Sequence, residues 1–509
     1  MQLNFIGGPI GSELIVGPII IAYVYTLYCS RIKLIFVNIK EMKLFLFIYI
    51  IALFVSLIHG LYIYPYYDLI FNGPADQIEK LPMVLKFLNY HNIIIEEKIL
   101  LSIWFVARFL KNIVLEIFYT FGFSYIIYCW FKEDPSVGVR ILKKASFIIV
   151  GIIIVYSIFE ISYFAGYEWA KNVLINVNPF LHAIRENFGW WPPLLWSSPR
   201  VRSIFPEPSQ FGIYAAFIMP FIWSDILNKK SLILGISMCG LLSLLVFMSL
   251  SKTSNILLLF EIVLLILFAF IRHKMIFINK CALIIIITGV AFGVNILCLS
   301  NYGGKPFNGE TSSFNAESKV SGTENQFGHK EGTLEEYLQN NIVGVTNENM
   351  GSNGARFAII NNDLRVGKDH CLIGVGSNLK SAYTTYYFTE KELAIREIKK
   401  CRQLQYEQGV LKTGYPNVSE FSLRFAENGI LGLFIYIVPI IILLFLMFKT
   451  KREIFLLFND FEINTIVCML ISLVGCFVSG GSSVLTTIQS YWILLGLMYA
   501  YVLQAYSIK

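Results

Sequence analysis

Long apolar blocks constrain this chain of 509 residues more than any other feature. A helix needs about 20 consecutive apolar residues to cross a hydrocarbon core of about 30 Å. Eleven blocks meet this requirement: residues 6–28, 44–65, 109–131, 145–166, 207–227, 231–250, 254–272, 276–299, 423–448, 463–480 and 483–505. Only 15% of the residues are charged, against about 25% in soluble domains. The sequence therefore predicts an all-α polytopic membrane helix bundle with about eleven transmembrane helices. It excludes a soluble enzyme, a disordered chain and a secreted disulfide scaffold.

Lys and Arg residues cluster in alternate short connections, such as 31–43, 132–144 and 449–452. Connections rich in Lys and Arg face the cytoplasm. We therefore predict a multi-pass protein of the plasma or inner membrane, with its N-terminus outside and its C-terminus in the cytoplasm. The net charge of +7 belongs mostly to these connections, so it does not indicate a nucleic-acid partner.

One outer connection is much longer than the others. It divides the chain into residues 1–299 with eight spans, a large extracytoplasmic loop domain at 300–422, and residues 423–509 with three spans. A loop of this length in a compact protein is usually functional. Its first part, residues 301–355, is rich in Gly, Ser, Asn and Glu. We predict that this part is mobile and acts as a lid.

The second part of the loop contains signals for an amphipathic helix. Thr389 and Glu392 have the spacing of a capping box. Ala394, Ile398 and Cys401 then fall on one helical face, and Gly409 is placed to end the helix.

Charged side chains gather where the fifth and seventh spans begin on the outer side. Arg200 and Arg202 precede Glu207, and guanidinium groups suit phosphate because they stay charged and donate in a planar fork. Glu207 is a candidate base for a sugar hydroxyl, or orients an arginine. Lys252, in the short turn 250–255, adds a further positive charge. The alternative roles are snorkelling to lipid headgroups for the cations and interaction with the helix N-terminus for Glu207.

Two further groups of charged residues lie in and after the long loop. Arg356 and Arg365 precede His370, which titrates near neutral pH and is a candidate base; the alternative is a solvated loop histidine. At the ninth span, charged residues lie at positions i, i+4 and i+7, on one helical face; these are Glu420, Arg424 and Glu427. Such charges should face protein or water rather than lipid. The alternative for this face is an ion pair that ties the helix to the loop.

Four of these segments resemble, in the same order, motifs of bacterial O-antigen polymerases and ligases. They are Arg202 with Phe205-Pro206-Glu207-Pro208-Ser209, then Ser251-Lys252-Thr253, then Arg356 followed by Gly374-Val375-Gly376, and finally Asn417 through Gly432. The resemblance covers most of residues 197–435. Ligases of this family typically have a histidine where Pro416 stands, and the family usually has arginine where Lys252 stands. Both departures favour the polymerase (Wzy-like) branch.

The resemblance implies a glycosyltransferase of cell-surface polysaccharide (O-antigen, capsule or exopolysaccharide). Such an enzyme moves a growing glycan from polyprenyl diphosphate to a lipid-linked repeat unit at the outer leaflet. We expect metal-independent transfer without a cofactor, since no Asp-x-Asp pair occurs in the outer connections. The expected partners are the lipid-linked oligosaccharide and membrane lipid, with a flippase and a chain-length regulator as candidates.

The predicted site residues divide into two classes. The candidate catalytic residues are Glu207, His370 and Glu427, and the candidate diphosphate ligands are Arg200, Arg202, Lys252, Arg356, Arg365 and Arg424. Two other functions stay open: ligase-type transfer of finished polymer to a terminal acceptor, and transport of lipid-linked oligosaccharide. Transporters usually place polar residues in broken helices at the membrane midplane, whereas the charges here gather at the outer side.

Overall fold

The computed structural model describes residues 2–3, 8–9, 13–32, 40–74, 81–93, 95–181, 193–196, 199–228, 232–302 and 351–507. The predicted mobility of residues 301–355, and their role as a lid, fall largely outside these residues. The chain forms two compact units, and each unit combines three separate stretches. Unit 1 comprises Met1–Pro18, Ser136–Val345 and Phe458–Cys476, and unit 2 comprises Ile19–Pro135, Thr346–Leu457 and Phe477–Lys509.

The fold is all-α, as predicted, and contains in addition one antiparallel pair of two-residue strands. Among the described residues, seven helices are long and apolar enough to cross a membrane. They are Met42–Ile63, Pro135–Phe164, Pro208–Leu227, Lys252–Arg272, Met275–Cys298, Glu420–Lys449 and Asp460–Ser479. These seven helices coincide with seven of the predicted spans, and the total of eleven stays a prediction.

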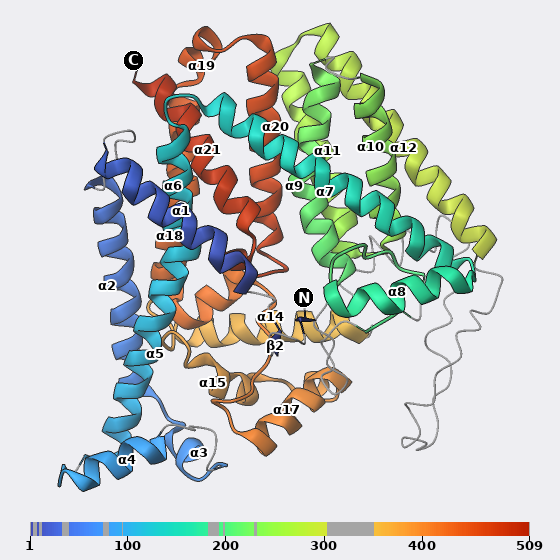
Figure 1. The fold of residues 1–509 in the computed structure, drawn as a ribbon. Helices are drawn as coiled ribbons and strands as arrows, with labels where there is room; N and C mark the ends of the chain where they lie inside the picture. The colour runs from blue at the N-terminus through green and yellow to red at the C-terminus, as the bar shows by residue number, and fades with distance from the viewer. Residues whose placement is uncertain are drawn as a thin grey trace. The chain divides into compact units, whose positions relative to one another are not determined.

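Unit 1 is built around α9, whose residues are almost all buried. Figure 1 shows the course of this helix and of its neighbours in the chain. Its elements are β1 (Gln2–Leu3), β2 (Gly8–Pro9), α7 (Pro135–Phe164), α8 (Glu168–Leu181), α9 (Pro208–Leu227), α10 (Leu232–Met248), α11 (Lys252–Arg272), α12 (Met275–Tyr302) and most of α20 (Asp460–Ser479). Helix α9 packs against α10, α11 and α12. Gly212 of α9 permits close contact with α11, because a Cβ there would collide with Ser254.

Unit 2 is built around α18, which packs against α2, α14 and α21. Its elements are most of α1 (Glu13–Arg31), α2 (Lys40–Ile63), α3 (Tyr67–Phe71), α4 (Leu81–Tyr90), α5 (Glu97–Tyr119), α6 (Phe121–Phe131), α14 (Gly351–Asp369), α15 (Lys380–Tyr387), α16 (Glu390–Leu393), α17 (Arg396–Gln408), α18 (Glu420–Lys449), α19 (Lys451–Leu457), η3 (Leu485–Thr487) and α21 (Gln489–Tyr506). The loop residues described from Gly351 onward thus belong to the same unit as α2, α5 and α18.

Two predicted helices of unit 2 are divided in the structure. The span predicted at 109–131 consists of α5 and α6, separated at Thr120, whose φ of −116° and ψ of −99° are not helical. The helix predicted after Thr389 begins with the expected capping box. It stops after one turn, because Ile395 has extended backbone, and a second helix runs to Gln408 with Gly409 as its C-cap. The capping prediction is confirmed, and the prediction of one continuous helix is wrong.

Candidate active site

The loop that contains Gly374-Val375-Gly376 is held against the first turns of α18 by backbone hydrogen bonds. Val375 N donates to Ala426 O at 3.0 Å, and Gly376 N donates to Glu427 O at 2.8 Å. The two glycines have φ values of +78° and +95°, a region that L side chains rarely adopt. A Cβ on Gly374 would also collide with the Glu427 carbonyl. The glycine pattern is therefore explained by this close approach.

Helix α18 is interrupted at Gly429, which has φ +65° and ψ −171°. At the interruption Ile430 N donates to Cys371 O at 2.8 Å, so the loop replaces a hydrogen bond within the helix. The side-chain amide of Asn428, the residue before Gly429, donates from Nδ2 to Ser377 Oγ at 2.7 Å. These contacts fix the helical segment that ends with Glu427 and Asn428 relative to the loop.

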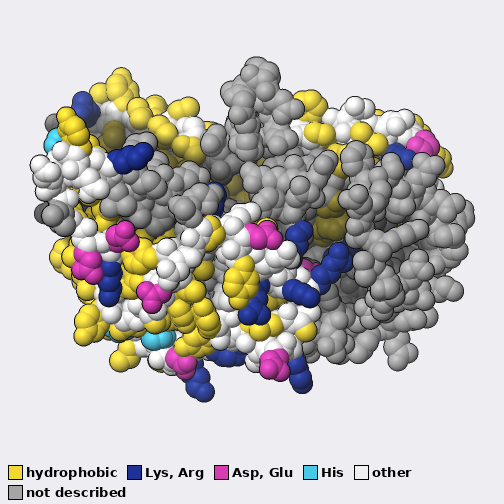
Figure 2. Space-filling model, turned by 90° about the horizontal axis from the view of Figure 1, so that it is seen from below, with side chains coloured by type: hydrophobic (Ala, Val, Ile, Leu, Met, Phe, Trp, Pro, Cys, Tyr) yellow, Lys and Arg dark blue, Asp and Glu magenta, His cyan; other side chains and the backbone are white. Residues whose placement is uncertain are grey.

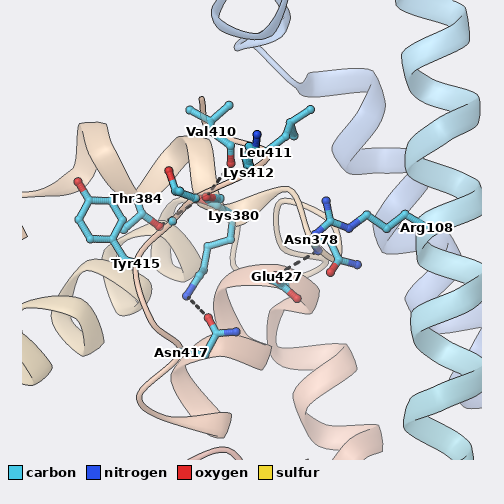
Figure 3. Close-up of a pocket in the computed structure, with 13 residues that line it drawn as sticks. Arg108, Asn378, Lys380, Thr384, Val410, Leu411, Lys412, Tyr415, Asn417 and Glu427 are labelled. Carbon is cyan, nitrogen blue, oxygen red and sulfur yellow. Dashed lines mark hydrogen bonds between the residues drawn. The ribbon is translucent and has the colours of Figure 1, made fainter. Parts of the chain in front are cut away.

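A cavity of about 220 Å³ lies beside this loop (Figure 3). Its walls come from α5, the α14–α15 connection, α15, the α17–α18 connection and α18. The lining residues are Arg108, Asn378, Lys380, Ser381, Thr384, Val410, Leu411, Lys412, Thr413, Gly414, Tyr415, Asn417 and Glu427. We call this cavity the α18 pocket. It combines three cationic side chains with one carboxylate, and every lining residue belongs to unit 2.

The carboxylate and one of the cations approach the same loop residue. Glu427 Oε1 accepts a hydrogen bond from Asn378 N at 3.1 Å. Arg108 reaches from α5 toward Asn378 (Figure 3), and the Asn378 side chain accepts from Asn112 of α5 at 3.0 Å. Cations can neutralise an anionic ligand, and a carboxylate can take up a proton. The α18 pocket therefore contains the group types needed to displace a phosphate leaving group with a hydroxyl.

A buried ion pair supports the floor of the α18 pocket. Lys380 Nζ lies 2.9 Å from Asp363 Oδ1, and both side chains are almost inaccessible to solvent. Ser422 donates to the same carboxylate at 3.1 Å, and Lys380 donates to Asn417 at 3.3 Å (Figure 3). Burial raises the pKa of Asp363, and the Lys380 ammonium opposes this increase. The ion pair thus orients Lys380 at the pocket wall.

Basic side chains are frequent on the face of unit 2 that carries α17 (Figure 2). Helix α17 contains four Lys or Arg residues and two Glu residues. Three of the basic residues, Arg396, Lys399 and Lys400, are exposed, and so is Lys412 after the helix. Basic side chains outnumber acidic ones on α17, and an excess of one sign raises the local concentration of oppositely charged ligands, so this helix favours an anionic ligand.

Arg424, a predicted diphosphate ligand, is buried in a network inside unit 2. Its guanidinium donates to Glu420 at 2.7 Å, to Tyr49 at 3.1 Å and to Glu116 at 2.6 Å. It also lies 4.6 Å from the centre of the Tyr436 ring. The network joins α18 to α2 and α5, rather than to the long loop as the alternative reading of this helical face expected.

Arg365, another predicted ligand, forms a two-pronged pair with Glu392 of α16. Its Nη1 donates to Glu392 Oε2 at 2.8 Å and to the Tyr387 carbonyl at 2.6 Å. Burial would raise the pKa of Glu392, but hydrogen bonds from Arg365 and Thr389 outweigh it and hold this pKa below its usual value. In the structure Arg365 therefore connects α14 to α15 and α16.

His370 and Arg356 both belong to the α14 region. The His370 ring lies edge-on to Tyr383, with 5.7 Å between ring centres. Burial lowers the pKa of His370; Asp369 opposes this effect and His59 adds to it. Arg356 is half-buried on α14. Neither residue lines the α18 pocket, so Glu427 is the one predicted site residue found there.

Arg202, in unit 1, is enclosed by its own chain. Only 1% of its side chain is exposed, and its Nε lies 3.9 Å from Glu160 Oε1. Its two terminal nitrogens donate to the carbonyls of Leu194 at 3.0 Å and Pro206 at 3.3 Å. Burial lowers the pKa of Arg202, while Glu160 opposes this change. The contacts fix the chain just before α9.

The other predicted residues of unit 1 lie at the starts of α9 and α11. Arg200 donates to the carbonyls of Ser249 at 3.5 Å and Leu250 at 3.2 Å. Glu207 is the N-cap of α9 and accepts from the Ser209 hydroxyl at 3.1 Å. Lys252 is the half-buried first residue of α11. Arg200, Arg202, Glu207 and Lys252 thus belong to one unit, and the α18 pocket belongs to the other.

Part of the chain, which includes the long loop and the start of α18, matches a known protein family. Residues 236–437 match the family described as O-antigen ligase. Comparisons with curated proteins and with solved structures give no match. The O-antigen ligase match supports a function related to cell-surface polysaccharide, carried out by a multi-pass membrane protein of the glycosyltransferase type. It includes Lys380, Asn417 and Glu427, whereas Arg108 and Arg202 lie outside it.

Several residues of the α18 pocket were not predicted from the sequence. Arg108 is remote in sequence from the rest of the pocket and belongs to none of the segments that resemble family motifs. Lys380 and Asn378 follow the Gly374–Gly376 motif by a few residues, and Asn417 begins the last motif. Asn378, Lys380 and Asn417 are thus polar residues within or next to segments that resemble O-antigen ligase motifs, and this position is the signal in the sequence that marks them.

Proposed function

We propose that the protein is a polymerase of cell-surface polysaccharide with its transfer site in the α18 pocket. The observation that carries the proposal is the cavity in which Arg108, Lys380 and Lys412 share the walls with Glu427. The donor is a growing glycan on polyprenyl diphosphate, and the acceptor is a hydroxyl of a lipid-linked repeat unit at the outer leaflet. The O-antigen ligase match supports the polysaccharide class.

In the proposed reaction the acceptor oxygen bonds to the anomeric carbon of the donor glycan. The bond from this carbon to the diphosphate oxygen breaks, and the diphosphate leaves with the electron pair. Arg108 and Lys412, with Lys380 behind them, neutralise the departing anion. Each charge-assisted hydrogen bond contributes about 1.5–3 kcal/mol. Glu427 takes the proton of the acceptor hydroxyl, and its bond to Asn378 N holds the carboxylate in place.

The other predicted site residues take different parts in this proposal. Four arginines hold the fold together, because their charged atoms contact carbonyls and carboxylates of the chain; they are Arg200, Arg202, Arg365 and Arg424. Lys252 and Arg356 stay candidate ligands of a diphosphate. Glu207 and His370 stay alternative bases.

A ligase is the second candidate function, and the match to the O-antigen ligase family is the observation that favours it. A ligase would use the same donor chemistry but transfer finished polymer to a terminal acceptor. The α18 pocket suits both reactions, because the leaving group is the same diphosphate.

Analysis of lipid-linked intermediates in a deletion strain separates these functions. A polymerase predicts accumulation of single lipid-linked repeats, and complementation with Glu427→Gln should not relieve it. Accumulation of long lipid-linked polymer would instead identify a ligase. Repeats retained in the inner leaflet would overturn both proposals and indicate a transporter.

A further inference from the structure

A group of tyrosines lies where α2 ends and α15 runs past it. We define the tyrosine cluster as Tyr64, Tyr66, Tyr67, Tyr383 and Tyr386, all in unit 2. The rings of Tyr66 and Tyr386 are stacked almost parallel, with 4.9 Å between centres and 7° between planes. Tyr386 is 55% exposed. The stacked pair therefore presents aromatic surface outside the protein core.

The remaining rings hold this stacked pair in position. The ring of Tyr383 is buried and meets Tyr66 edge-on, with centres 4.9 Å apart and an angle of 89°. Tyr64 contacts Tyr383 at 6.0 Å and Phe105 of α5 at 6.1 Å. Edge-to-face contacts of this kind stabilise a defined ring orientation. The exposed ring is thus supported by a rigid aromatic group.

The tyrosine cluster and the α18 pocket share helix α15, and both have α5 as a neighbour. Helix α15 contributes Lys380 and Thr384 to the pocket and Tyr383 and Tyr386 to the cluster. Helix α5 contributes Arg108 to the pocket, while Phe105, one turn earlier, packs on the cluster. Lys380 and Tyr383 are one turn apart on α15, as Phe105 and Arg108 are on α5, so the inner side of the cluster borders the pocket wall.

The chemistry of the cluster suits a sugar ring. One face of a pyranose consists of C–H groups that pack on an aromatic ring, while its hydroxyls need polar partners. Tyrosine provides both an apolar face and a polar end. Next to the cluster, Asp369 is exposed and accepts a hydrogen bond from Tyr387. Burial and this carboxylate raise the pKa of Tyr387 to about 12, so its phenol keeps its proton at neutral pH.

We propose that the tyrosine cluster is a saccharide-binding subsite. It holds the sugars next to the diphosphate of a lipid-linked glycan bound in the α18 pocket. This inference rests on the proposed function, because it assumes that the pocket binds the diphosphate. It assigns the cluster a part in recognising which glycan is bound, separate from the cations that bind every lipid diphosphate.

The test measures binding of two probes to the purified full chain in lipid nanodiscs. One probe is the lipid-linked oligosaccharide extracted from a deletion strain, and the other is geranylgeranyl diphosphate, which carries no sugar. Tyr386→Ala should weaken binding of the oligosaccharide about tenfold and leave the sugar-free probe unchanged. Tyr386→Leu, which keeps apolar bulk without a flat ring, should give the same selective loss. Tyr406→Ala, at an exposed tyrosine of α17 outside the cluster, is the control and should change neither affinity.

The alternative outcomes are distinguishable. Oligosaccharide binding that is unchanged in both Tyr386 variants would overturn the subsite and leave the α18 pocket standing. An equal loss for both probes would also overturn it, because it would indicate a structural role or an interfacial aromatic belt. A wild-type protein that binds neither probe would contradict the proposed function itself.

Discussion

The two groups of basic residues differ in what surrounds their charged atoms. In unit 1, Arg202 is 1% exposed, and its guanidinium contacts two backbone carbonyls and Glu160. In unit 2, Arg108 is exposed and lines a cavity of about 220 Å³ together with Lys412 and Glu427. Arg202 has the surroundings of a structural cation, and Arg108 has those of a ligand-binding cation.

An arginine motif at the start of a membrane helix therefore does not by itself identify an anion-binding site. A guanidinium that satisfies carbonyls of its own chain contributes to folding, and its removal leaves buried polar groups unpaired. A guanidinium at the wall of a cavity contributes mainly to binding. Substitutions of the buried cations of unit 1 should therefore lower the stability of the protein. Substitutions in the α18 pocket should instead lower activity while the protein level stays normal.

The largest effect on stability is expected for Arg202→Ala. The substitution leaves the Glu160 carboxylate buried without its partner, which costs about 3–5 kcal/mol. We expect strongly reduced amounts of protein in membranes and a lower melting temperature in detergent. Adding Glu160→Gln should restore part of the loss, because the uncompensated charge is removed. If Arg202→Ala protein were present at the normal level but made no polymer, Arg202 would be a ligand-binding residue and not a structural one.

Arg108→Ala should have a smaller effect than Arg202→Ala, and the effect should be on the activation free energy of transfer and not on stability. Loss of one charge-assisted hydrogen bond of about 1.5–3 kcal/mol corresponds to roughly a 10- to 100-fold lower transfer rate. Polymer per molecule of protein is the measurement, with protein level determined on the same membranes. Lys111→Ala, at an exposed lysine of the same helix, should leave the rate unchanged. A drop in Arg108→Ala protein level equal to the drop in polymer would count against a binding role.

Two glycines with positive φ allow the strain of an added Cβ to be separated from its collision with neighbouring atoms. Gly374 has φ +78°, and a Cβ there would collide with the Glu427 carbonyl; Gly166 has φ +91° and open space around it. Gly166→Ala should cost only the conformational strain of about 1–2 kcal/mol. Gly374→Ala should cost more and should also shorten the polymer, because it displaces the loop from α18. Thermal melting and polymer length are the two readouts, and equal melting with equal polymer would contradict this account of the loop.

The smallest effect is expected for Glu392→Gln, and it depends on pH. The pKa of Glu392 is lowered in the folded protein. Its carboxylate therefore adds stability above its unfolded-state pKa and loses this contribution as the pH falls through the folded-state value. At pH 7 the free energy of unfolding, followed by thermal melting, should fall by at most about 1 kcal/mol, because the ion pair with Arg365 is partly exposed. The difference from wild type should shrink as the pH falls below the ordinary glutamate pKa of about 4.3, and disappear below the lowered folded-state pKa. Glu390→Gln, at an exposed residue of the same helix, should show no such trend.

The sequence predicts features that depend on neighbours along the chain. Apolar length located seven helices that meet the criteria for spans, and residue spacing predicted the capping box at Thr389. The sequence also predicted that Glu420 and Arg424 share one helical face, and in the structure these two residues form an i,i+4 ion pair.

The sequence could not predict features that depend on tertiary contacts. Arg424 also binds Tyr49 and Glu116, which are more than 300 residues away along the chain. Arg108 reaches the α18 pocket only because α5 lies beside the loop that carries Asn378. Nothing in the local pattern distinguishes this arginine from Arg365, whose partner is a carboxylate of α16.

The most direct test of the account is the turnover of purified Glu427→Gln protein in nanodiscs, with the lipid-linked oligosaccharide of a deletion strain as substrate. Loss of a general base predicts turnover at least about 100-fold below wild type, with an unchanged melting temperature. Wild-type turnover by a fully folded Glu427→Gln protein would contradict the claim that the α18 pocket carries out the transfer.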